Sequence, residues 1–294
     1  IAANSGDCAI ALGSAGNAAA SVAAYAAKAQ IPCFVFLPTG AVKERAMQVM
    51  SYGAHLILVE GTIDDCIHLA YSGQERFGWR NLITSMRFHP MGTEGYKTIA
   101  YELGRQLGFE VPDWIIVPLG GGSLFSKIYR GYHDMLQLGL IDHLPRLIAV
   151  QAEGCAPLVK AYENSQTVTE RWGEPDTIAF AIADVDTFEG VTVLEIIKRT
   201  GGRAISVNDE EILCAMRLTA EKEGVLAEPA SATTIAAFKK LRDTGFIKQG
   251  DSAVCILSGS AMRDLKLLSS GISPICKVSA NDMDPLMQWI PKYF

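Results

Sequence analysis

Short apolar runs alternate with amphipathic stretches along most of the chain. The runs have the length of buried strands, and the stretches between them repeat apolar residues with the period of a helix. The predicted strands are Cys8–Leu12, Cys33–Leu37, His55–Val59, Trp114–Val117, Leu147–Gln151 and Ala253–Leu257. The predicted helices are Asn17–Ala29, Val42–Tyr52, Thr62–Ala70, Glu94–Leu107, Phe125–Leu136, Glu210–Glu223 and Ala230–Thr244. This alternation with short connections predicts an α/β fold of parallel strands covered by helices.

The pattern occurs in two blocks, and 294 residues are enough for two domains. We expect a smaller α/β domain over residues 1–100 and a larger one over residues 101–294. The polar stretch Asn164–Pro175 is expected to be a surface loop. Because the chain begins with Ile1 and carries no leader, we expect the smaller domain to be N-terminally truncated.

Charge and composition argue against several partners. The chain has 26 basic and 32 acidic residues, a net charge of -6, and no basic run, so nucleic acid is not expected as a partner. Cys8–Ala27 is uncharged, but it consists mostly of Ala, Gly and Ser, which gain little from lipid. The seven cysteines and five histidines form no metal-like spacing. We therefore expect no membrane partner, no metal, and buried thiols in a reducing cytoplasm.

Three predicted strand ends carry candidate chemistry, because ligands of open α/β sheets bind at the carboxyl ends of strands. The first is Gly13–Asn17, where a helix begins and its free backbone N–H groups could hold a carboxylate. Asn17 either caps this helix or reaches a ligand oxygen. The last of the three along the chain is Ser258–Ser260, where a serine is either a turn residue or a ligand contact.

The second strand end is the glycine run Gly120–Gly122, which precedes Ser123 and Leu124. Successive glycines cost backbone entropy, and a plain turn needs only one, so the run favours a backbone site for phosphate. No Gly-Lys-Ser/Thr follows, which excludes a Walker loop. Position 125 is Phe, so the run does not complete a dinucleotide-binding G-x-G-x-x-G either.

Together these segments resemble the threonine synthases, in the tryptophan-synthase-β (fold type II) class of pyridoxal-phosphate enzymes. The resemblance runs from about Asp7 to Asp264. Its motifs are Ser14–Ala27 (S-x-G-N-x-x-A-S-x-A-A-Y-A-A), Glu94–Thr98 (E-G-x-K-T), Leu138–Gly154 and Glu228–Ala232 (E-P-A-S-A). It implies two doubly wound open-sheet domains with a cofactor cleft between them.

The resemblance also implies roles for individual residues. Pyridoxal 5'-phosphate would be bound by Asn17, Gly120, Gly121, Gly122, Ser123, Leu124 and Ser258. Asn17 would bond its phenolic oxygen, the glycine run its phosphate, and Ser258 its pyridine nitrogen. The substrate would be bound by Ser14, Ala15, Gly16, Ser85 and Arg87. Arg87 could pair two phosphate oxygens of the substrate, or it could be a solvated loop charge.

Three departures from the family pattern bear on activity. The Schiff-base lysine of the S-x-K-D-R segment is missing, so we expect it upstream of Ile1, no catalytic residue in this chain, and an inactive fragment. The phosphate loop Gly-Gly-Gly-Ser-Leu is closer to the G-G-G-G-L of serine/threonine dehydratases than to the G-N-x-G-N of threonine synthases. Gly259–Asp264 replaces the usual G-H-G-x-K-D.

The function implied is that of a cytoplasmic, homodimeric lyase of threonine biosynthesis. It would convert a small-molecule substrate, O-phosphohomoserine, and water to threonine and phosphate. One alternative is a serine/threonine dehydratase-type lyase. A second is a lysine-less protein that binds pyridoxal phosphate without catalysis.

Overall fold

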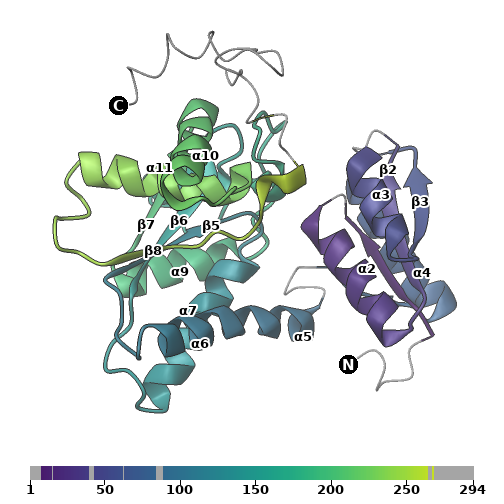
Figure 1. Ribbon diagram of the computed structural model, residues 1–294, viewed down its shortest axis with the longest axis horizontal. Coiled ribbons are helices and arrows are strands. Elements are labelled where there is room, and N and C mark those ends of the chain that lie inside the picture. Colours follow the sequence, from purple (N-terminus) through teal and green to yellow (C-terminus); the bar gives the residue numbers. More distant parts are fainter. Residues whose placement is uncertain are drawn as a thin grey trace, which may run out of the picture. The chain divides into compact units, whose positions relative to one another are not determined.

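The computed structural model describes residues 8–14, 16–39, 43–61, 63–83, 89–263 and 267. Helices surround two four-stranded parallel sheets in this part of the chain (Figure 1). Both sheets belong to one unit, Ile1–Arg263. The predicted α/β class with parallel strands is confirmed, whereas the boundary at residue 100 stays a prediction.

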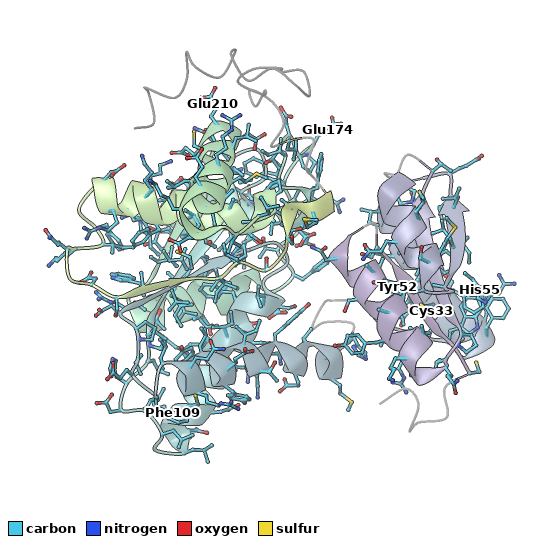
Figure 2. All side chains as sticks on the ribbon, in the orientation of Figure 1. Cys33, Tyr52, His55, Phe109, Glu174 and Glu210 are labelled. Atoms are coloured by element: carbon cyan, nitrogen blue, oxygen red, sulfur yellow. The ribbon has the colours of Figure 1, made fainter. Side chains whose placement is uncertain are left out.

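The first sheet has the strand order β3-β2-β1-β4. Its strands are β1 Ile10–Gly13, β2 Cys33–Pro38, β3 His55–Val59 and β4 Arg80–Asn81. The register pairs Ile10 of β1 with Cys33 on one side and Arg80 on the other, so β1 lies inside the sheet. The edge strand β3 begins at His55, which is exposed at the margin of the sheet, while Cys33 is buried (Figure 2).

Helices α2 Asn17–Ala29, α3 Lys43–Ser51 and α4 Ile63–Phe77 cover this sheet. Alternate residues of β1 point to opposite faces: Leu12 joins the core with α2, whereas Ala11 joins the core with α4. Gly13 lies where α4 crosses β1. A Cβ atom at Gly13 would stand 2.5 Å from the backbone of Cys66, so only glycine allows this approach.

The second sheet has the strand order β7-β6-β5-β8. Its strands are β5 Trp114–Pro118, β6 Arg146–Ala152, β7 Arg203–Val207 and β8 Ala253–Cys255. Trp114 pairs with Arg146 on one side and with Ala253 on the other, which places β5 inside the sheet. Every residue of β5 is buried, as expected for a parallel strand covered on both faces.

Seven α-helices accompany the second sheet in the described residues: α5 Pro90–Thr93, α6 Lys97–Gln106, α7 Ser123–Gln137, α8 Pro157–Glu163, α9 Gly190–Thr200, α10 Asp209–Glu223 and α11 Pro229–Asp243. The 3-10 turns are Glu94–Tyr96, Phe180–Ile182 and Ala261–Arg263. Side chains of α7 and α9 form one core with β5 and β6. Helix α11 packs on β5 and β6, and α10 packs on α11 (Figure 1).

Several expectations need correction. The predicted helix Glu94–Leu107 begins as a 3-10 turn, and α6 starts only at Lys97. The predicted strand Cys8–Leu12 starts at Ile10, and the predicted helix Thr62–Ala70 continues to Phe77. The uncharged stretch Cys8–Ala27 is divided between β1 and α2. We find no helix in the described residues whose length and hydropathy would let it span a bilayer.

Candidate active site

Two of the three loops with candidate chemistry, those after β1 and β5, follow the inner strands of the sheets. In the first sheet the chain goes from β1 to β2 on one side and reaches β4 on the other. In the second sheet it goes from β5 to β6 on one side and reaches β8 on the other. The carboxyl ends of β1 and β5 are therefore topological switch points, where open α/β sheets bind their ligands.

The glycine run Gly120–Gly122 connects β5 to α7, and we call it the phosphate loop after its predicted role. Leu119 anchors it through a hydrogen bond from its N–H to the carbonyl of Val150, at 2.8 Å. Gly122 precedes the first residue of α7 with φ 101° and has no side chain to cap the helix. The N–H groups of the three glycines donate to no residue in the described part of the chain. Free N–H groups at a helix N-terminus fit a phosphate, and the positive φ requires glycine at position 122.

The segment 184–189 packs against the phosphate loop. A Cβ atom at Gly120 would stand 2.3 Å from a carboxylate oxygen of Asp184, and one at Gly122 would stand 2.9 Å from Cβ of Glu189. The N–H of Glu189 donates to the carbonyl of Gly121 at 3.0 Å. The glycines therefore serve two purposes: they leave N–H groups free, and they allow this segment to approach closely.

Asn17 does not cap α2. The residue before the helix is Gly16, and no side chain caps it. The Asn17 amide instead donates to both carboxylate oxygens of Glu228, at 2.9 and 3.1 Å. Glu228 is buried and immediately precedes α11. Of the two readings of Asn17, the helix cap is wrong, and the side chain is directed at a polar group far away in the sequence.

Ser258 follows β8 and lies beside the start of α11. Its hydroxyl is 3.3 Å from the hydroxyl of Ser231, which also accepts from the N–H of Gly259 at 2.7 Å. The N–H of Glu228 donates to the carbonyl of Gly259 at 3.0 Å. Ser258 is exposed, whereas Ser231 is fully buried.

The structure thus brings Asn17 and Ser258 to one place through Glu228, Ser231 and Gly259. No hydrogen bond between described residues joins this group to the phosphate loop. Ser14 lies just after β1, where its hydroxyl accepts from the N–H of Gly16 at 3.3 Å. Ala15, Ser85 and Arg87 lie outside the described residues. Glu228 belongs to a quoted motif, but the sequence alone assigned it no partner.

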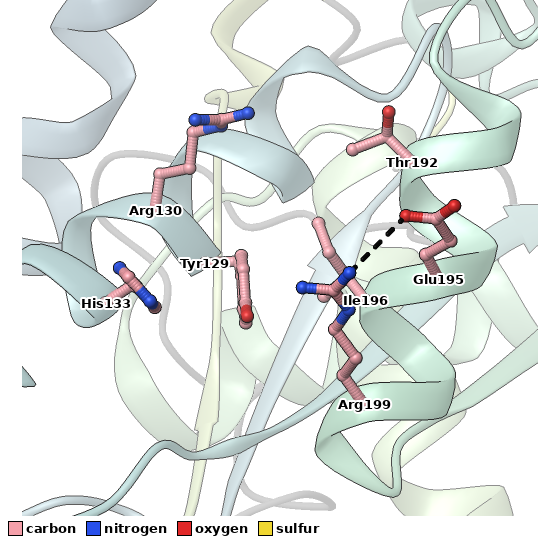
Figure 3. Close-up of a pocket in the computed structure, with 7 residues that line it drawn as sticks. All are labelled: Tyr129, Arg130, His133, Thr192, Glu195, Ile196 and Arg199. Carbon is pink, nitrogen blue, oxygen red and sulfur yellow. Dashed lines mark ion pairs between the residues drawn. The ribbon is translucent and has the colours of Figure 1, made fainter.

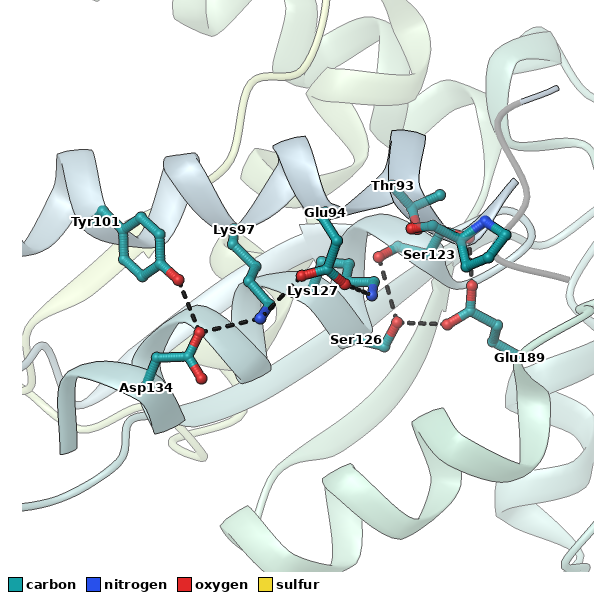
Figure 4. Close-up of polar contacts among 10 residues, drawn as sticks. Thr93, Glu94, Lys97, Tyr101, Ser123, Ser126, Lys127, Asp134 and Glu189 are labelled. Atoms are coloured by element: carbon teal, nitrogen blue, oxygen red, sulfur yellow. Dashed lines mark hydrogen bonds and ion pairs between the residues drawn. The ribbon is translucent and has the colours of Figure 1, made fainter. Parts of the chain in front are cut away.

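The Glu94–Thr98 motif forms a polar network between α6 and α7 (Figure 4). Lys97 pairs with Glu94 at 2.9 Å and with Asp134 at 3.0 Å. Glu94 also pairs with Lys127, whose side chain is only 4% exposed, whereas that of Glu94 is 48% exposed. The Glu94 carboxylate of this motif therefore compensates the buried charge of Lys127, on the helix that begins at the phosphate loop.

The network gives a test by pH. The hydrogen bonds from Lys127 and then Lys97 lower the pKa of Glu94 below its ordinary value. A carboxyl with a lowered pKa in the folded state stabilises the protein above its unfolded pKa and loses this contribution as pH falls through the folded pKa. Glu94→Gln should therefore flatten the decline in stability below about pH 5, by less than about 1 kcal/mol because Glu94 is half-exposed.

Urea unfolding at a series of acidic pH values measures this effect. The control is Glu102→Gln on α6, the helix that follows Glu94. Among the described residues, the Glu102 carboxylate accepts only from the neutral amide of Gln106, at 3.0 Å. If the free energy of unfolding declines equally at acidic pH in the wild type and in Glu94→Gln, the prediction is contradicted.

A separate groove of about 320 Å³ lies between α7 and α9 (Figure 3). Its lining residues are Tyr129, Arg130, His133, Thr192, Glu195, Ile196 and Arg199. Along the α9 side of the groove, Arg199 pairs with Glu195 at 3.9 Å. None of these residues was predicted to bind cofactor or substrate, so the groove is distinct from the candidate active site.

Comparison with known families agrees with the geometry of the strand ends. A family model described as pyridoxal-phosphate dependent enzyme matches residues 2–259, nearly the whole chain. The chain belongs to the family of pyridoxal-phosphate dependent enzymes. Pyridoxal phosphate is therefore the cofactor of this enzyme family, as the sequence resemblance implied.

Curated relatives of this pyridoxal-phosphate dependent enzyme include several threonine synthases. The threonine synthase of Methanosarcina acetivorans is 37% identical over 246 residues, which are 83% of this chain and 60% of the relative. That of Methanocaldococcus jannaschii is 38% identical over 240 residues, 81% of this chain and 58% of the relative. The chain thus spans about three-fifths of the length of these relatives.

Solved structures show the same fold. A fungal L-serine ammonia-lyase from Rhizomucor miehei superposes with a TM-score of 0.74 at 22% identity, covering 90% of this chain and 83% of that one. The processed threonine deaminase isoform 2 from Solanum lycopersicum superposes with a TM-score of 0.73 at 20% identity, covering 90% and 74%. This pyridoxal-phosphate dependent enzyme therefore has fold type II, as predicted.

The described residues fit the cofactor chemically. The phosphate loop offers N–H donors at a helix N-terminus for a phosphate, and the positive φ of Gly122 presents that turn without strain. Asn17 and Ser258 offer neutral polar groups for the ring heteroatoms. We find no carboxylate bonded to the Ser258 hydroxyl among the described residues, where its hydrogen-bond neighbour is Ser231.

Proposed function

We propose that this chain is the main part of a lyase of the threonine-synthase type, which converts O-phosphohomoserine and water to threonine and phosphate. The observation that carries the proposal is the hydrogen bonding of Asn17 to Glu228 beside Ser258. This contact joins the start of α2 to the start of α11 at the end of β8, where the family motifs would bind the cofactor ring. Identities of 37–38% to threonine synthases support the substrate class.

In this proposal the chain's own residues bind and orient the cofactor. Bound pyridoxal phosphate supplies an electron sink that makes the Cα proton of an amino acid removable. The phosphate loop would hold the cofactor phosphate, together with the first N–H groups of α7 at Ser123 and Leu124. The Asn17 amide has two N–H donors, one for Glu228 and one for the phenolic oxygen.

Ser258 would set the electronic character of the ring. A serine hydroxyl carries no charge, so it cannot stabilise a protonated pyridine nitrogen as a carboxylate does. The ring would therefore stay largely neutral, which suits elimination and replacement better than transamination. The turn of Ser14, Ala15 and Gly16 would hold the substrate carboxylate, and Ser85 and Arg87 its phosphate.

Product analysis of the full-length protein tests this function. With O-phosphohomoserine as substrate, we expect release of inorganic phosphate and threonine in equal amounts. With threonine as substrate, we expect release of ammonia to be at least about tenfold slower, an activation difference of about 1.4 kcal/mol. Faster turnover of threonine than of the phosphorylated compound would contradict the proposal.

A dehydratase acting on serine or threonine is the second candidate. It is favoured by the Gly-Gly-Gly-Ser-Leu sequence of the phosphate loop and would release ammonia from unphosphorylated substrates. A pyridoxal-phosphate-binding protein without catalysis would bind the cofactor and turn over neither substrate. A cytoplasmic homodimer is part of the proposal, and sedimentation of the purified protein tests the dimer.

A further inference from the structure

Glu189 occupies an unusual place beside the phosphate loop. It precedes α9, is 5% exposed, and is joined to the loop by its N–H bond to the carbonyl of Gly121. Its carboxylate accepts hydrogen bonds from the hydroxyl groups of Ser123 and Ser126, the latter at 2.5 Å (Figure 4). A buried carboxylate thus lies at the helix terminus that would bind an anion.

The two serine contacts have a chemical consequence. A serine hydroxyl has one proton to donate, and it can otherwise only accept. The Ser123 proton is directed to Glu189, so this hydroxyl cannot at the same time donate to a phosphate. Ser123 then contributes its backbone N–H to the anion site, whereas its side chain serves the carboxylate.

The negative charge of the Glu189 carboxylate also disfavours phosphate binding. Two negative charges a few ångströms apart repel more strongly in a partly buried site than in water, by about 1 kcal/mol or more. Glu189 therefore weakens the attraction that the N-terminus of α7 exerts on a phosphate. The carboxylate is fixed by two hydroxyl groups, and the Cα and Cβ atoms of Glu189 lie close to Gly122, so the side chain stays beside the loop when an anion binds.

We propose that Glu189 is a positioning residue that sets the phosphate affinity of the loop. It takes the protons of Ser123 and Ser126, leaves phosphate binding to the backbone N–H groups, and lowers the affinity for a doubly charged phosphate. The inference rests on the proposed function, in which this loop holds the cofactor phosphate.

Glu189→Gln tests the inference because it keeps the shape of the side chain and removes the charge. The new amide donates to one serine, whose proton then becomes available to the phosphate. We expect inorganic phosphate and pyridoxal phosphate to bind about tenfold more tightly at about pH 8, measured by calorimetry on the full chain. A residue that only supports the fold would weaken binding when changed, so a gain in affinity separates the two roles.

Two further variants complete the experiment. Glu195→Gln removes an exposed carboxylate from α9, the helix that follows Glu189. This carboxylate pairs with Arg199 at 3.9 Å, and its removal should change phosphate affinity less than about twofold. Ser123→Ala should also change it less than about twofold, because the lost hydroxyl is not a phosphate donor. If Glu189→Gln does not fold, as judged by thermal unfolding, Ser123→Ala decides the question.

The outcomes separate this inference from the proposed function. Wild-type protein that binds neither probe would overturn the proposed function, and this inference with it. Wild-type protein that binds both probes, while Glu189→Gln binds them equally or more weakly, would overturn the inference alone. A loss of about tenfold or more in Ser123→Ala would do the same, because it would show that the hydroxyl holds the phosphate.

Discussion

Gly122→Ala is expected to lower the free energy of unfolding by about 3 kcal/mol and to abolish phosphate binding by the loop. Two costs combine at this position. The backbone has φ 101°, which L side chains rarely adopt, and the new methyl group would stand 2.9 Å from Cβ of Glu189 and 3.1 Å from a methyl group of Val193. Relief of either contact moves the segment whose N–H groups would face the phosphate.

Urea unfolding and phosphate calorimetry measure the two effects. Gly139→Ala is the matched control, since Gly139 also has a positive φ, 69°, but a Cβ atom there would meet nothing within 4 Å. This control should cost only about 1 kcal/mol, the usual penalty for a left-handed residue, and should leave phosphate binding intact. Equal losses of stability in the two variants would show that crowding by Glu189 and Val193 is not significant.

Asn17→Asp is expected to make the stability of the protein strongly dependent on pH. The new carboxylate would lie where the Asn17 amide now meets the two oxygens of Glu228, at 2.9 and 3.1 Å. Two carboxyl groups this close cannot both ionise without repulsion, so the pair binds a proton more tightly in the folded state than in the unfolded chain. A carboxyl group whose pKa is raised in the folded state stabilises the protein most below its unfolded pKa. This stabilisation is lost as pH rises.

Relative to the wild type, the loss in free energy of unfolding caused by Asn17→Asp should therefore be small near pH 4 and reach about 2 kcal/mol at about pH 8. Unfolding curves at the two pH values, compared with the wild type, give this difference directly. Asn17→Ala removes the hydrogen bonds without adding a charge, and its deficit should change little between the two values. If the aspartate and alanine variants lose the same stability at both values, Asn17 and Glu228 are not in contact.

Elements with strong local signals were predictable from the sequence. The helix Asn17–Ala29 and the strand His55–Val59 have the predicted bounds, because each is a regular pattern ended by a glycine or a turn. Three helices (α5, α8 and α9) and two strands (β4 and β7) were missed. The segment of α9 is rich in β-branched residues, which favour strands, and only packing against β6 and α7 makes it helical. Strand β4, with two residues, is too short to form a pattern.

The candidate site was predictable only as separate loops. Sequence spacing identified the glycine run and Asn17, since turn chemistry is local. The contacts of Glu189 and Glu228 depend on residues 66 and 211 positions away, and no periodicity encodes such pairings. The acid-glycine pair Glu189–Gly190 was a weak signal for a helix start, because an acidic residue is favourable at a helix N-terminus.

The pairing of β8 with β5 has a consequence for synthesis of the protein. Asp113, at the start of β5, bonds Ser252, which is 139 residues later in the sequence. At about 5–20 residues per second, a ribosome needs roughly 7–28 s to make the intervening segment. During this time the apolar strand β5 has an open edge, the kind of edge that recruits strands from other chains. In a nascent chain of this protein, this edge of β5 therefore stays without its native partner until β8 has left the ribosome.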